Sequence, residues 1–137
     1  LEQLQGFEVL DSSFTKRNIE KPLAHLLNNR FGVTYNIDAE VYAIEIEFSE
    51  ETGNFVSKHT WHNTQKFIQL ETGNWLMKIQ CGINRELVGW LMMWMSNARV
   101  IKPNKLKELL TEKLENTLSY YKENKPLTFN NTFRNTV

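Results

Sequence analysis

The histidines His59 and His62 form the only close histidine pair in the sequence. In a helix they would share one face at positions i and i+3, a spacing that two ligands of one metal ion can use. A zinc site needs three or four ligands, yet the single cysteine, Cys81, is distant and no carboxylate stands at a fixed offset from the pair. We therefore predict no metal site and no cofactor.

Other candidate chemistry has a simpler structural interpretation. Glu45 and Glu47 would share one face of a strand and could act as acid and base, but the outward face of an amphipathic strand also explains them. Cys81 ends an apolar strand pattern, which predicts packing rather than nucleophilic chemistry. His25 lies among leucines, which favours a structural histidine over a metal ligand or a catalytic base. Glycine-rich phosphate loops, nucleophile elbows and HExxH motifs are absent from the sequence. We predict a module that is not an enzyme and has no catalytic residues.

The composition narrows the class of protein. The 137 residues suit one domain, and 16 basic residues balance 16 acidic ones. Direct nucleic-acid binding usually needs a basic excess on one face, so we do not expect it. A lone cysteine fits a cytoplasmic location, and no apolar run or signal-like start indicates a membrane or export. Because the first residue is Leu1 rather than Met, we expect that this chain is a piece of a longer protein.

The element that must organise these residues is a helix within residues 83–103. Its first fourteen or so residues are predicted to be helical, with Asn84 as the N-cap and Glu86 in the first turn. At about 100° per residue, Trp90 and Met93 fall on the flank opposite the main apolar face, so apolar side chains cover about 260° of the circumference. We expect a sheet on one side of this helix and a second copy or another domain on the other. The alternative is a helix buried within one small domain. The main apolar face holds Leu87, Val88, Leu91, Met92, Trp94 and Met95.

Alternating and helical patterns predict the other elements. The segment 49–58 is ambiguous between a helix start and a hairpin turn, and residues 4–10 read as a lone strand. A helix with Pro22 in its first turn is expected to end near Phe31, with Gly32 as its stop. The order from residue 41 is that of an α+β, ferredoxin-like split β-α-β sandwich, βαββαβ, with an extra C-terminal helix and an N-terminal strand and helix linker. The predicted strands are residues 41–48, 66–70, 75–81 and 98–101, with a hairpin turn at residues 71–74. The C-terminal helix is residues 104–121, and its core-facing positions are predicted to be Leu106, Leu109, Leu110, Leu114, Thr117, Leu118 and Tyr121.

Several motifs together resemble a known family. They are the segment HTWHNTQ at residues 59–65, Gly73 before a strand, Glu86 and Leu87 at the start of a tryptophan-rich helix, and VIKP at residues 100–103 followed by Leu106. From about residue 4 to residue 121 the chain resembles the C-terminal portion of WYL-domain bacterial transcriptional regulators, the WCX extension. The resemblance implies that residues 1–36 are the end of the WYL core and a linker, and residues 37–122 the extension domain. It also implies a helix at residues 49–58. Residues 123–137 lack periodicity and are rich in Asn and Thr, which predicts a flexible tail.

Members of that family typically carry a DNA-binding winged helix-turn-helix, a WYL domain that senses a ligand, and an extension that helps to dimerise and regulate. The tryptophan-tyrosine-leucine signature is absent here, so only Trp61, His62 and Gln65 map onto the extension's own motif. We predict a regulatory module that forms a homodimer and whose partners are the parent protein's WYL and DNA-binding domains. The predicted self-association residues are Trp90, Met93 and Trp94.

The alternative function is the sensing of a small molecule or nucleotide, with Trp61, His62 and Gln65 as ligand-binding residues. We favour a bracing role for these three, because a Trp beside a hydrogen-bonding His and Gln commonly satisfies a polar corner.

Overall fold

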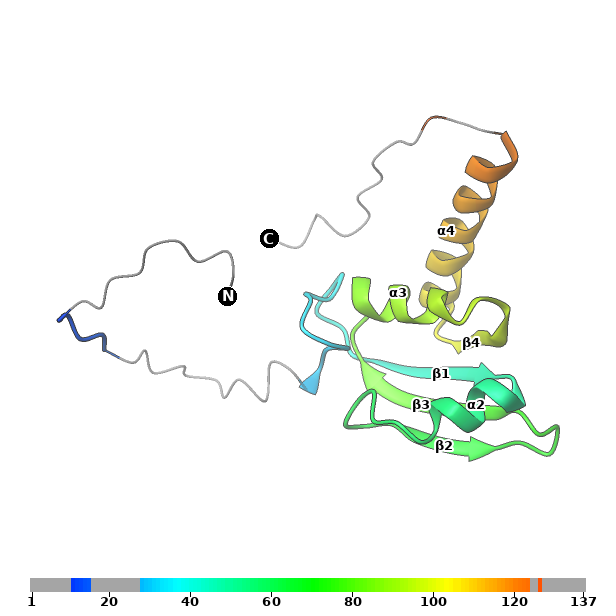
Figure 1. The fold of residues 1–137 in the computed structure, drawn as a ribbon, viewed down its shortest axis with the longest axis horizontal. Helices are drawn as coiled ribbons and strands as arrows, with labels where there is room; N and C mark the ends of the chain where they lie inside the picture. The colour runs from blue at the N-terminus through cyan, green and yellow to red at the C-terminus, as the bar shows by residue number, and fades with distance from the viewer. Residues whose placement is uncertain (1–10, 16–27, 124–125, 127–137) are drawn as a thin grey trace.

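The computed structural model describes residues 11–15, 28–123 and 126 (Figure 1). The described part is a mixed α+β fold with one four-stranded antiparallel sheet, in the order β2-β3-β1-β4, and three α-helices. A 3₁₀ turn, η1 (Met95–Asn97), precedes the last strand. In chain order the elements are β1 (Tyr42–Phe48), α2 (Glu50–Val56), β2 (Lys66–Gln69), β3 (Trp75–Cys81), α3 (Arg85–Met93), β4 (Ala98–Lys102) and α4 (Asn104–Glu123).

The central strands form as the alternating pattern predicts. In β1 the apolar residues Ile44, Ile46 and Phe48 are buried, while Glu45 and Glu47 lie on the opposite face. β3 pairs with β1 in antiparallel register and contributes Met77, Ile79 and Cys81 to the same core. The hairpin from β2 to β3 turns at residues 71–74, where Gly73 takes a φ of 89°. One face of the sheet is therefore apolar and covered, and the other is polar.

Two helices cover the apolar face. Val56 of α2 and Leu87 of α3 are fully buried in the same cluster as Ile46. The helix α2 confirms the expectation for residues 49–58 that came from the family resemblance. Gly53 lies in this helix against Trp75, and a Cβ atom there would stand only 2.4 Å from the indole ring. The close approach requires glycine, which explains why the helical pattern of this segment is weak in the sequence.

The organising helix α3 begins as predicted and ends sooner. The Asn84 side chain accepts a hydrogen bond from the Leu87 backbone N–H at 2.9 Å, which confirms the predicted N-cap. The helix ends at Met93, not near residue 96, and Trp94 forms its C-cap. Met95 then takes a left-handed φ of 49° and is 79% exposed, so it does not extend the apolar face of the helix.

The segment before β1 is bound to the start of α3. The Glu86 carboxylate accepts hydrogen bonds from the backbone N–H groups of Val33 at 2.6 Å and Thr34 at 3.0 Å. These contacts lower the pKa of Glu86, chiefly through the Thr34 backbone N–H. Phe31, which was predicted to lie in the linker, is buried in the core against Trp90.

The helix α4 packs against β4 only near its start, where Leu106 is fully buried. Lys105 donates a hydrogen bond to Asp38 at 2.6 Å, a contact that raises the pKa of Lys105 to about 12. Farther along, the predicted core positions are exposed: Leu114 by 53%, Leu118 by 51% and Tyr121 by 85%. The prediction of a core-facing stripe is therefore wrong for the second half of α4, which extends beyond the sheet (Figure 1).

Three predicted features lie wholly or mostly outside the residues that the structure describes. The strand at residues 4–10 and most of the helix predicted from Pro22 lie outside the described residues. In the described end of that helix, residues 29–31 form turns and bends. The tail predicted from residue 123 also lies outside them, apart from Glu123, which is still in α4, and Pro126.

Candidate functional site

The three residues of the HTWHNTQ motif that were predicted to bind a ligand lie in the loop between α2 and β2. The Gln65 Oε1 atom accepts hydrogen bonds from two backbone N–H groups, Trp61 at 2.6 Å and His62 at 3.0 Å. Its Nε2 atom donates to the His59 carbonyl at 2.7 Å. Both ends of the Gln65 amide are therefore used within the loop, which this side chain closes.

Trp61 fixes the same loop to the preceding helix. Its indole Nε1–H donates to the Val56 carbonyl at 2.8 Å, which satisfies an acceptor at the end of α2. The ring packs on Trp90 with centroids 5.2 Å apart. Trp61 thus joins the end of α2 to Trp90 of α3.

His62 is buried, with 7% of its surface exposed, and stacks on Phe31 at a centroid distance of 6.4 Å. Its Nδ1 atom is 2.8 Å from the Thr64 hydroxyl. Burial lowers the pKa of His62, and nearby backbone groups of Arg30 and Asn28 oppose part of that shift. No hydrogen bond of good geometry reaches Nε2 from the described residues. The contacts of all three motif residues support bracing of the loop.

The residues predicted for self-association have three different environments. Trp90 is only 9% exposed, because Phe31, Phe48 and Trp61 of its own chain cover it. Trp94 is half-buried and meets Trp61 edge to face at 6.1 Å, whereas Met93 is 58% exposed. The predicted ligand residue Trp61 and the predicted interface residues Trp90 and Trp94 therefore form one aromatic cluster within the chain. Sequence reasoning missed this cluster because its members come from separate segments.

A second feature that sequence reasoning missed is an apolar groove between α3 and α4. Its volume is about 350 Å³, and it opens beside the exposed leucines of α4. The length of α4 was the available signal. Twenty residues span about 30 Å as a helix, whereas the five residues of β4 span about 17 Å as a strand, so the strand cannot cover the whole helix. The groove is lined by Leu91, Met92, Met95, Ser96, Ala98, Val100, Leu110 and Leu114.

The remaining candidate catalytic groups, Cys81, Glu45 and Glu47, are packed in the core or held in ion pairs. Cys81 is fully buried in the core, and burial raises the pKa of its thiol to about 12. Glu45 and Glu47 form ion pairs on the polar face of the sheet. Within residues 11–15, 28–123 and 126, no three His, Cys, Asp or Glu side chains come together in a group able to hold a metal ion. In the same part of the chain, every helix is too short or too polar to cross a membrane.

The family model of the WCX domain matches residues 40–118, more than half of the chain. The chain belongs to the WCX domain family. Its matched region begins just before β1 and ends within α4, so it contains the whole sheet, the loop between α2 and β2, and the apolar groove. WCX domains are associated with WYL-type regulators, which agrees with a regulatory module. No curated protein matches the chain.

Within the WCX domain, the HTWHNTQ segment and the tryptophans of α3 meet in one cluster. Phe31 completes this cluster from outside the matched range. Because this cluster is covered within the chain, two other surfaces remain exposed among the described residues. They are the apolar side of α4 with its groove and the polar face of the sheet.

Proposed function

We propose that this WCX domain is a non-catalytic regulatory module of a cytoplasmic, bacterial, WYL-type transcriptional regulator and that it acts by self-association. In the parent protein its neighbours would be a WYL domain and a DNA-binding domain. Two copies held at a fixed distance would match the spacing of two DNA half-sites, since operator symmetry mirrors protein symmetry. We further propose a ferredoxin-like classification, which the sheet order β2-β3-β1-β4 and the element order support.

The observation that carries the proposal is the exposed apolar side of α4. Leu114 and Leu118 are more than half exposed and continue the line of Leu110 from the groove. A helical segment without tertiary cover is marginal in water, because most helix stability in proteins comes from packing of the apolar face. Continuous apolar surface of this kind marks association sites.

A second copy of the chain fits this surface by symmetry. An isologous interface places the same patch on both subunits, so the α4 leucines of each copy would enter the groove of the other. Met93, which is more than half exposed and adjoins the groove residue Met92, would extend the contact, whereas Trp94 packs on Phe55 and Trp61. Trp90 has no part in this version of the interface, because its own chain covers it.

The test is the solution mass of the chain by light scattering over a dilution series. We expect a dimer down to low micromolar concentration and a monomer for the double variant Leu114→Gln/Leu118→Gln. Glutamine keeps the helix propensity while it removes the apolar surface. The matched control is Glu108→Gln/Glu112→Gln on the other side of the same helix, which should remain a dimer. A wild-type monomer at all concentrations would contradict self-association.

A further inference from the structure

The polar face of the sheet carries a row of four charged side chains, one from each strand. The strand register places Lys66 of β2 opposite Lys78 of β3, Lys78 opposite Glu45 of β1, and Glu45 opposite Lys102 of β4. Side chains directly opposite each other on one face stand about 5 Å apart at Cβ. The row therefore contains three ammonium groups and one carboxylate.

The single carboxylate of this row does not reach all three lysines. Glu45 lies 3.5 Å from Lys78 and 3.5 Å from Lys102. Lys66 forms no ion pair with any residue that the structure describes, and it directly faces the like charge of Lys78. Like charges in this position destabilise a strand pair unless a counterion lies between them.

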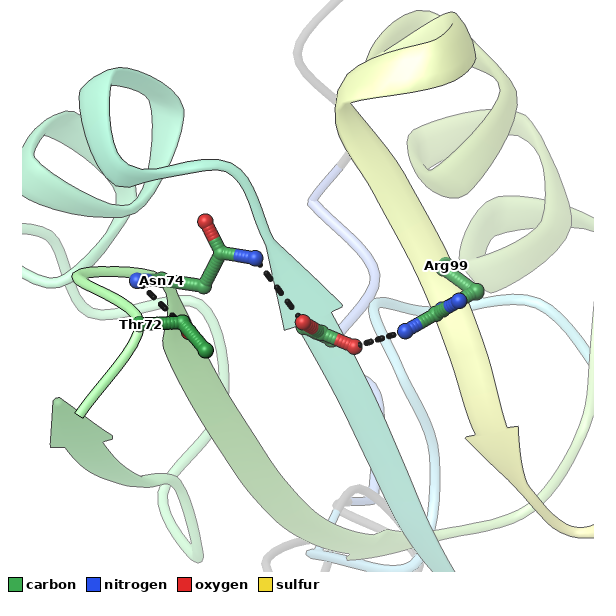
Figure 2. Close-up of polar contacts among 4 residues, drawn as sticks. Thr72, Asn74 and Arg99 are labelled. Atoms are coloured by element: carbon green, nitrogen blue, oxygen red, sulfur yellow. Dashed lines mark hydrogen bonds and ion pairs between the residues drawn. The ribbon is translucent and has the colours of Figure 1, made fainter. Parts of the chain in front are cut away.

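The neighbouring row shows the usual compensation. There Glu47 faces one cation, Arg99, and also accepts a hydrogen bond from Asn74 at 2.9 Å (Figure 2). These contacts lower the pKa of Glu47, first of all through Arg99. The surplus of positive charge is therefore local to the row of Lys66, although the whole chain has zero net charge.

A hollow of about 430 Å³ lies beside the two facing lysines. Ala43 lines the hollow next to the charged row, and its small methyl side chain leaves this space open. The Thr64 hydroxyl is already bonded to the backbone of Gln80. The Gln80 side-chain amide, in contrast, makes no hydrogen bond to any described residue, so it has a donor to offer.

We propose that this hollow is an anion site that binds a phosphate group through Lys66 and Lys78, with the Gln80 amide as an added donor. Lysine ammonium groups bind phosphate as point charges, and charge-assisted hydrogen bonds are the stronger ones. The anion supplies the second negative charge that the row lacks. The phosphate can be inorganic or part of a small molecule such as a nucleotide, because the volume is in the range of ligand sites.

The test is a titration of the ¹⁵N-labelled chain, followed by amide chemical shifts at constant ionic strength. The probes are inorganic phosphate, AMP and adenosine. We expect saturable shifts at Ala43, Lys66, Lys78 and Gln80 with the first two probes and none with adenosine. Tighter binding of AMP than of phosphate identifies a nucleotide-like ligand, and equal affinities identify the phosphate alone as the recognised group.

The variants give the signature of this site. Lys66→Gln should weaken phosphate binding by about tenfold, as the loss of one charge-assisted contact predicts. Glu45→Gln should tighten it, because the variant removes the carboxylate that competes for Lys78. Lys107→Gln on α4 is the control and should change nothing. The proposal is overturned if no shift saturates, if adenosine binds as well as AMP, or if Lys66→Gln and Lys107→Gln have equal effects. The dispersion of the same spectra shows whether each variant is folded.

Discussion

The side-chain oxygen of Gln65 lies 2.6 Å from the backbone nitrogen of Trp61, and the same oxygen also accepts the N–H of His62. Gln65→Met keeps the length of the side chain but leaves both N–H groups and the His59 carbonyl without this partner. We expect a loss of about 1 to 3 kcal/mol in the free energy of unfolding, measured by urea denaturation. Gln69→Met, at an exposed position, should lose less than about 0.5 kcal/mol. Equal losses would mean that the Gln65 contacts do not brace the loop.

A second prediction concerns Asn84, which is fully buried. Its Oδ1 atom caps α3 at Leu87, while its Nδ2 atom donates to the Phe31 carbonyl at 2.9 Å. Asn84→Asp keeps the cap but sets a buried carboxylate oxygen against that carbonyl. We expect a loss of about 3 kcal/mol or more. Asn54→Asp, at an exposed position of α2, is the control and should be close to neutral; a neutral Asn84→Asp would disprove the donor role of Nδ2.

The third prediction is a dependence of stability on pH that arises from His62. Burial lowers its pKa below the ordinary value of 6.5, so the unfolded chain binds the proton more readily than the folded chain. The free energy of unfolding is therefore unaffected by protonation of His62 above about pH 6.5. It falls as the pH drops below that value, and the loss levels off below the pKa of His62 in the folded chain. Glu47 and Glu86 have pKa values lowered from 4.5, so their stabilising contributions are lost only in more acidic solution.

Urea denaturation at pH 7.5, 6.5 and 5.5 measures this effect. The wild-type chain should lose stability over this range, and His62→Gln should flatten the dependence. His59→Gln, at an exposed position, should retain the fall seen for the wild type. The assignment to His62 would be wrong if both variants behaved alike.

The fourth prediction concerns the thiol of Cys81. It is fully buried, and its pKa is raised to about 12, so almost no thiolate exists near neutral pH. A disulfide reagent such as Ellman's should leave the native chain unmodified over hours and react at once in urea. Rapid reaction of the folded chain would show that the core opens far more readily than its packing suggests.

The predictable parts of the fold were those set by local pattern. β1, the β2–β3 hairpin and the Asn84 cap follow from alternation, turn residues and a capping side chain that stand next to one another in the sequence. The early end of α3 was not predictable in this way, because the apolar pattern continues through Met95 while the backbone turns there. The cover of Trp90 depends on Phe31 and Trp61, which come from segments that periodicity cannot place together.

The candidate sites, like the fold, were predictable only where the residues involved lie close together in the sequence. Trp61, His62 and Gln65 were identified from a motif, but their roles depend on hydrogen bonds that only the folded loop reveals. The charged row of the sheet needs the register of three strand pairs, which no single segment contains. The apolar side of α4 has the period of a core-facing helix, and only the short strand beside it shows that the second half is left uncovered.

Residues 28–36, just upstream of the WCX match, are bonded to the start of α3. They contact the chain around the start of α3 at four backbone positions: Asn29 O accepts from Gly82 N, Phe31 O from Asn84, and the Val33 and Thr34 N–H groups bind Glu86. Phe31 adds a ring that presses on Trp90. Any movement imposed on this segment would therefore be transmitted to the first turn of α3 and to the tryptophans it carries. Residues 28–36 are thus hydrogen-bonded and packed directly onto the start of the helix.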